Sequence, residues 1–170
     1  MRRNSTLKRG LLATMLAVAV MGLALANPVA AGQGGTARPI EGTGTGTNII
    51  TFGLPTTIVV DEVADMSHLG ATTIHLEGAV TPTVTGSVLS GTAIMVAANG
   101  DTLTLALSGT TTNTPTGAQG VVVGQIAGGT GRFESASGTI TDNVVLTITS
   151  VTPTGVVAAV SSTFSGSISY

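Results

Sequence analysis

Hydrophobic and polar residues alternate with a period of two through most of the chain after Ala37. The last stretch, VVAAVSSTFSGSISY, shows this most clearly. One face carries Val156, Ala158, Val160, Phe164, Ile168 and Tyr170, and the other carries Ser161, Thr163, Ser165, Ser167 and Ser169. Such alternation is typical of a strand with one face in a core and the other in water. No apolar pattern of helical period is long enough to predict a helix.

Turn signals separate these alternating runs and predict eight strands. The predicted strands cover residues 37–47, 56–68, 71–80, 88–98, 102–111, 119–128, 137–149 and 156–170. Asn99-Gly100 predicts a type I′ hairpin turn, which needs two residues that tolerate positive φ. The fold class is therefore all-β, either an eight-stranded antiparallel β-barrel or a two-layer β-sandwich.

The first block of the sequence has the pattern of a signal peptide. Four basic residues precede an uncharged run at residues 10–26, and small residues suited to cleavage follow it. The run is shorter than the roughly 20 residues of a membrane span. We predict a signal peptide helix at residues 1–31, a flexible segment at 32–36 and a single barrel domain at 37–170. Cleavage after Ala26 fits as well, and both sites predict a secreted protein.

Charge and cysteine content narrow the partners. After cleavage, two basic residues, Arg38 and Arg132, face eight acidic residues, which gives a net charge of −6. This balance excludes nucleic acid and disfavours anionic membranes as partners, and we expect no membrane insertion after cleavage. The chain has no cysteine, so neither a disulfide nor a thiol nucleophile is available.

The glycine-rich stretch AGGTGRF lacks the spacing of either a phosphate loop or a dinucleotide turn. Gly128, Gly129 and Gly131 instead predict a tight structural corner, with Phe133 closing one end of the core. Arg132 is interpreted as part of a surface ion pair, with Glu134 or another carboxylate, rather than as a ligand clamp.

The segment DEVADMSHLGATTIHLEG contains both histidines of the chain. His75 and Glu77 are expected on one face of a strand, where they offer an acid and a base or two metal ligands, with His68 as a candidate third. The alternative is a solvated strand face, which the sequence favours. We therefore predict no metal and no cofactor, and the absence of a GxSxG motif gives no support to hydrolase chemistry.

Four motifs carry a family resemblance: SHLG at residues 67–70, AANGDTL at 97–103, GGTGRFESASGTI at 128–140 and the closing FSGSISY. Their order resembles that of bacterial secreted proteins of the allene oxide cyclase and dirigent barrel superfamily. The resemblance implies an eight-stranded antiparallel barrel with an apolar cavity, similar in shape to lipocalins. It places no catalytic residue on this chain.

These observations favour a secreted barrel that binds a small apolar molecule without catalysis. One alternative is an isomerase or cyclase that uses His75 and Glu77 on such a molecule. Another is a surface or matrix protein with a filled barrel. A cavity that contains His75 would favour the enzyme, and an apolar cavity without titratable groups would favour the binding protein.

Overall fold

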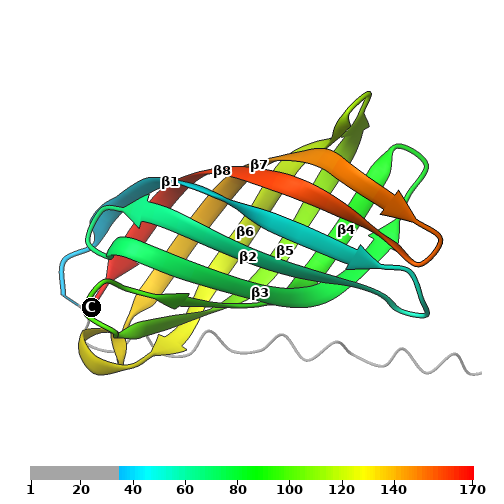
Figure 1. The fold of residues 1–170 in the computed structure, drawn as a ribbon. Coiled ribbons are helices and arrows are strands. Elements are labelled where there is room, and N and C mark those ends of the chain that lie inside the picture. The colour runs from blue at the N-terminus through cyan, green and yellow to red at the C-terminus, as the bar shows by residue number, and fades with distance from the viewer. Residues whose placement is uncertain (1–34) are drawn as a thin grey trace, which may run out of the picture.

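The computed structural model describes residues 35–170, which form a closed barrel of eight antiparallel strands (Figure 1). The strands are β1 (Arg38–Thr51), β2 (Thr56–Met66), β3 (Gly70–Pro82), β4 (Gly86–Val96), β5 (Thr102–Thr114), β6 (Gly117–Gly129), β7 (Ser137–Thr152) and β8 (Gly155–Ser169). Each strand pairs with the next, and β1 pairs with β8 along the whole length of β1. The prediction of eight strands in a barrel is confirmed, and the sandwich alternative is wrong because the sheet closes on itself.

The predicted signal peptide lies outside the described residues. Between residues 35 and 170, no helix is long and apolar enough to cross a membrane.

Alternation along β1 shows how the barrel wall is built. The sequence TGTGT places Thr43, Thr45 and Thr47 on the exposed outer surface and the intervening glycines inside. A Cβ atom at Gly44 would lie 3.1 Å from the side chains of both Glu62 and Phe164. Glycine in β1 therefore leaves room inside the barrel for side chains from the neighbouring strands.

The two ends of the barrel differ. One end, here called the closed end, carries the β2–β3, β4–β5 and β6–β7 connections and the C-terminus (Figure 1). Its side chains are packed without exposure, among them Ile40, Leu69, Leu103, Phe133 and Ile168. The other end, here called the open end, carries the four remaining hairpins: β1–β2, β3–β4, β5–β6 and β7–β8.

The turn between β4 and β5 differs from the predicted type I′ turn. Gly100 has a φ of +87°, whereas Asn99 is not among the described residues with positive φ. The Asn99 side-chain oxygen accepts a hydrogen bond from the Asp101 N–H at 3.2 Å, and the Ala97 N–H donates to the Asp101 carbonyl at 2.9 Å. The loop is thus one residue longer than predicted, and only its glycine takes the left-handed conformation.

Candidate functional site

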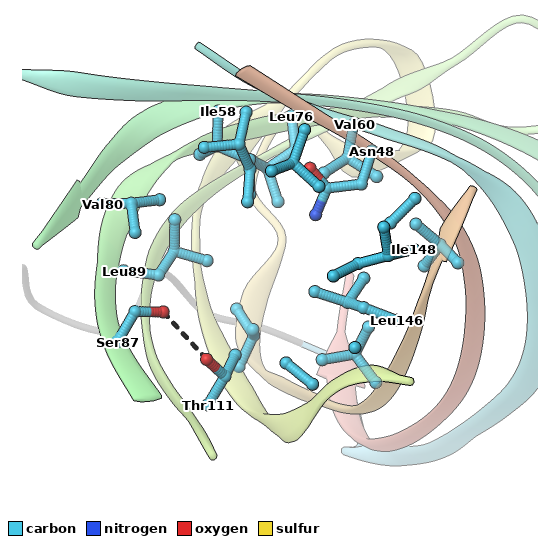
Figure 2. A pocket seen from close by; sticks show the side chains of 18 of the residues that line it. Asn48, Ile58, Val60, Leu76, Val80, Ser87, Leu89, Thr111, Leu146 and Ile148 are labelled. Atoms are coloured by element: carbon cyan, nitrogen blue, oxygen red, sulfur yellow. Dashed lines mark hydrogen bonds between the residues drawn. The ribbon is translucent and has the colours of Figure 1, made fainter. Parts of the chain in front are cut away.

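The open end leads into a cavity of about 250 Å³ inside the barrel. Its walls are mainly apolar, and Figure 2 shows Ile58, Val60, Leu76, Val80, Leu89 and Leu146 around the empty space. A hydrogen bond of 2.8 Å between the Ser87 and Thr111 hydroxyls joins β4 to β5 on one side of the cavity (Figure 2). Apolar walls with a few polar groups are typical of small-molecule sites.

Two carboxylates form the floor of this cavity. Glu62 on β2 and Asp142 on β7 line it, and both also line a smaller void of about 40 Å³. The other walls of that void include Met95 and Phe164, which are buried in the core. Glu62 and Asp142 therefore lie between the open cavity and the packed closed end.

Ser162 on β8 joins the two carboxylates. Its hydroxyl oxygen lies 3.2 Å from Glu62 Oε1 and 3.1 Å from Asp142 Oδ2. A serine hydroxyl has a single hydrogen to donate, so it satisfies one carboxylate as donor. The second contact is a hydrogen bond only when the other carboxyl group is protonated and donates to the serine oxygen. The geometry is therefore that of two carboxyl groups sharing one added proton.

Burial and charge favour that added proton. Desolvation of the Asp142 carboxylate, together with the negative charge of Glu62, raises the pKa of Asp142 to about 7, and the Ser162 hydrogen bond opposes this. Burial also raises the pKa of Glu62, and the hydrogen bond from Ser162 opposes this rise. Two neighbouring buried carboxylates cannot both ionise readily. The pair consequently holds one added proton below about pH 7 and loses it as the pH rises above that value.

Several polar atoms of this floor have no partner. Glu62 Oε2, Asp142 Oδ1 and Asn48 Oδ1 are buried without a hydrogen bond to any described residue. Asn48 is 1% exposed, and its amide lies at the cavity wall in Figure 2. Unpartnered buried acceptors are rare in folded proteins and call for an explanation.

The residues that the sequence singled out lie elsewhere. His75 and Glu77 point outward from β3, together with Thr73, while Ile74 and Leu76 point inward. His75 Nδ1 lies 2.7 Å from Asp61 Oδ1, and its Nε2 lies 3.3 Å from Glu77 Oε1. These hydrogen bonds raise the pKa of His75, that from Asp61 most. Neither His75 nor Glu77 lines the cavity, so they do not act on a molecule inside it.

His68 occupies the β2–β3 turn with a φ of +67°. Within residues 35–170, no group of three potential ligands for a metal ion is present.

The glycine-rich corner belongs to the closed end. Gly131 has a φ of +57°, and a Cβ atom there would collide with the Asp101 carboxylate. Arg132 donates a hydrogen bond of 2.6 Å to the His68 carbonyl, and its guanidinium lies 4.6 Å from the Phe133 ring centroid. Its carboxylate partner is Asp101, at 3.9 Å, rather than Glu134. Arg132 thereby ties together the three connections of the closed end.

Four polar residues of the floor were not predicted as site residues, although the sequence contains a signal for each: Asn48, Glu62, Asp142 and Ser162. Glu62 alternates in phase with Val60 and Ala64, which are buried core residues. Asp142, Ser162 and Asn48 likewise take positions of the apolar face on their strands. A polar residue in phase with a core face is the pattern that would have found the site.

Comparison with solved protein structures finds chains that match this one. The structure is similar to that of a pterocarpan synthase dirigent protein, with 16% sequence identity, coverage of 86% of this chain and 98% of that chain, and a TM-score of 0.45. No protein-family model and no curated protein matches the chain. Membership of the wider superfamily stays a prediction.

Proposed function

We propose that the protein binds a small apolar molecule in the cavity at the open end of the barrel. The observation that supports this is the cavity itself: the barrel has an unfilled volume of about 250 Å³, lined mainly by aliphatic side chains. Burying apolar surface of a ligand there releases roughly 25 cal/mol for each Å² removed from water. A structural protein would gain more stability from a filled core than from this cavity.

The enzyme alternative built on His75 and Glu77 loses its basis, because both side chains lie on the outer surface of β3. The ionisable groups that do line the cavity, Glu62 and Asp142, contribute to binding in the further inference below.

We also propose that the protein is secreted, on the basis of the signal-peptide pattern in residues 1–31. N-terminal sequencing of the protein from the culture medium or periplasm of its host tests this. We expect the sequence to begin at Gly32, or at Asn27 if cleavage follows Ala26. A protein that begins at Met1 contradicts the proposal.

The binding proposal is tested by filling the cavity. Ala158 lines it from β8 and is 3% exposed, whereas the adjacent Ala159 points to solvent. We expect Ala158→Phe to lose binding of a short-chain probe, n-octanol, in calorimetric titration. Ala159→Phe adds the same side chain on the outer surface and should bind like the wild type.

Native mass spectrometry of the protein from its own host, followed by solvent extraction, then identifies what occupies the cavity. The proposal is wrong if the wild-type protein neither binds n-octanol nor carries an extractable molecule. It is also wrong if Ala158→Phe binds the probe as tightly as Ala159→Phe does.

A further inference from the structure

The polar floor of the cavity offers hydrogen-bond acceptors with no charged donor opposite them. We propose that the ligand has a protonated amine head, which binds between Glu62, Asp142 and Asn48, and an apolar body in the rest of the cavity. This inference rests on the proposed binding function and names its ligand class.

The first argument is charge. Glu62 and Asp142 are the ionisable residues among those that line the cavity in the described part of the chain. The two arginines of residues 35–170 lie at the closed end, where both guanidinium groups are near the Tyr170 ring. A carboxylate or phosphate ligand would bring a further negative charge to the pair without a counter-ion. A cation supplies the missing charge.

The second argument is the count of hydrogens. The Ser162 hydroxyl provides one hydrogen for two carboxylates that lie 3.2 and 3.1 Å away. In the free protein, a proton bound to one of the carboxyl groups provides the missing hydrogen. An ammonium group carries up to three N–H donors and provides it in the same place. Its binding therefore releases the added proton to solvent, up to one for each ligand bound.

The third argument is Asn48, which is independent of the acidic pair. It is 1% exposed, its amide oxygen has no partner among residues 35–170, and its side chain faces the cavity (Figure 2). In the β1–β2 register Asn48 pairs with Val60, two residues before Glu62 on the same face. Asn48 and Glu62 thus lie on the same inner face of adjacent strands, two register positions apart.

The groups that face this floor from each packed strand are few. β2 contributes Glu62, β7 contributes Asp142, and β8 contributes the non-ionising Ser162. From β1 the floor receives Asn48 and the side-chain-free Gly44 and Gly46. The pH dependence of amine binding accordingly reports on the two carboxyl groups alone.

The test compares three probes with the same chain length: n-octylamine, n-octanol and n-octanoate. Calorimetric titration of the full-length mature protein at pH 8 should show n-octylamine binding at least about tenfold more tightly than n-octanol, as expected for a charge-assisted hydrogen bond to a buried group. Octanoate should bind most weakly. Repeating the titration at pH 6, where the pair still holds its added proton, in buffers of different ionisation enthalpy counts the protons released.

The sign of the pH dependence follows from the pair. As the pH falls from 8 to 6, the carboxyl pair gains its added proton while the amine stays charged, so octylamine affinity should drop. Octanol affinity should not change over this range.

Asp142→Asn keeps the shape of the floor and removes one ionising group, so it should reduce the preference for octylamine over octanol while octanol still binds. Asp65→Asn makes the same change on the outer face of β2, where the carboxylate is exposed, and should keep the wild-type preference. Glu62→Gln repeats the test from the other carboxylate.

The outcomes separate the two proposals. If none of the three probes binds and the protein carries no extractable molecule, the binding function itself is wrong. If octanol binds as tightly as octylamine to the wild type, or octylamine affinity is the same at pH 6 and pH 8, the amine inference alone is overturned. These wild-type results decide the matter even where a variant fails to fold.

Discussion

Asp142→Asn should reduce the loss of folding stability that accompanies a rise in pH from acidic to neutral. In the wild type the carboxyl group of Asp142 has a pKa of about 7, well above its ordinary value of 3.8, because burial and the charge of Glu62 disfavour its ionised form. In the unfolded chain the group ionises freely near its ordinary value. The folded state therefore holds a proton that the unfolded state has released between about pH 4 and pH 7.

The magnitude follows from proton linkage. For an acid whose pKa is higher in the folded state, the free energy of unfolding falls as the pH rises between the unfolded and folded pKa values, and is level above both. The interval from 3.8 to about 7, at about 1.4 kcal/mol for each pH unit, corresponds to a loss of about 4 kcal/mol. Asparagine has no proton to lose, and its amide can donate to Ser162 as the protonated acid does.

Urea denaturation at pH 5 and pH 8 measures this loss. Between pH 5 and the folded pKa of about 7, at about 1.4 kcal/mol for each pH unit, we expect the wild type to lose about 3 kcal/mol. Asp142→Asn should lose much less, so that the variant is the more stable protein at pH 8. His75 adds a fall of the same sign, because its raised pKa stabilises the fold at low pH only and this is lost as the pH rises through that value. That contribution is common to both proteins and cancels in their difference.

The matched control is Asp65→Asn, which removes an exposed carboxylate from the outer face of β2. It should show the wild-type pH dependence. If Asp142→Asn and the wild type lose the same free energy between pH 5 and pH 8, the two carboxyl groups are not coupled as their geometry indicates.

Three further tests address the closed end and the outer surface. Arg132→Ala removes the hydrogen bond to the His68 carbonyl and the contact with the Phe133 ring. It should lower the free energy of unfolding, measured by urea denaturation, by about 1–2 kcal/mol. Octanol binding at the open end should be unchanged. Gly131→Ala should cost more than Gly100→Ala, because both have positive φ but only the first meets a collision; equal melting temperatures would contradict this. His75→Ala should leave octanol affinity within twofold of the wild type, and a larger loss would place His75 in the binding site after all.

The sequence predicted the wall of the barrel better than its closure. Period-two alternation fixes which side chains of each strand share a face, and the observed strand bounds differ from the predicted ones by no more than four residues. Closure depends on pairing between β1 and β8, such as Gly44 with Ser162, whose partners are far apart in the chain. Alternation holds no information about such long-range partners, so it does not distinguish a barrel from a sandwich.

The site was missed for a different reason. Apolar residues mark the inner face of each strand, and His75 and Glu77 have the residue types of an acid–base pair although they point outward. Glu62 occupies an inner position of β2 by the same rule. That it meets Asp142 through Ser162, however, depends on strand curvature and on the absence of side chains at the β1 glycines, which only the folded structure supplies.

The closed sheet has a consequence for the chain before it folds. Residues 78–100, 102–131 and 143–170 contain no Asp, Glu, Lys, Arg or His. In most β-sheet proteins, lysine or other charged residues on exposed strand edges prevent such uncharged stretches of different molecules from pairing and aggregating; these residues are called gatekeepers. Here closure removes every edge in the native state, so the folded protein needs no gatekeepers. An unfolded chain has no such protection, and in concentrated solution the pairing of β1 with β8 must compete with aggregation between molecules.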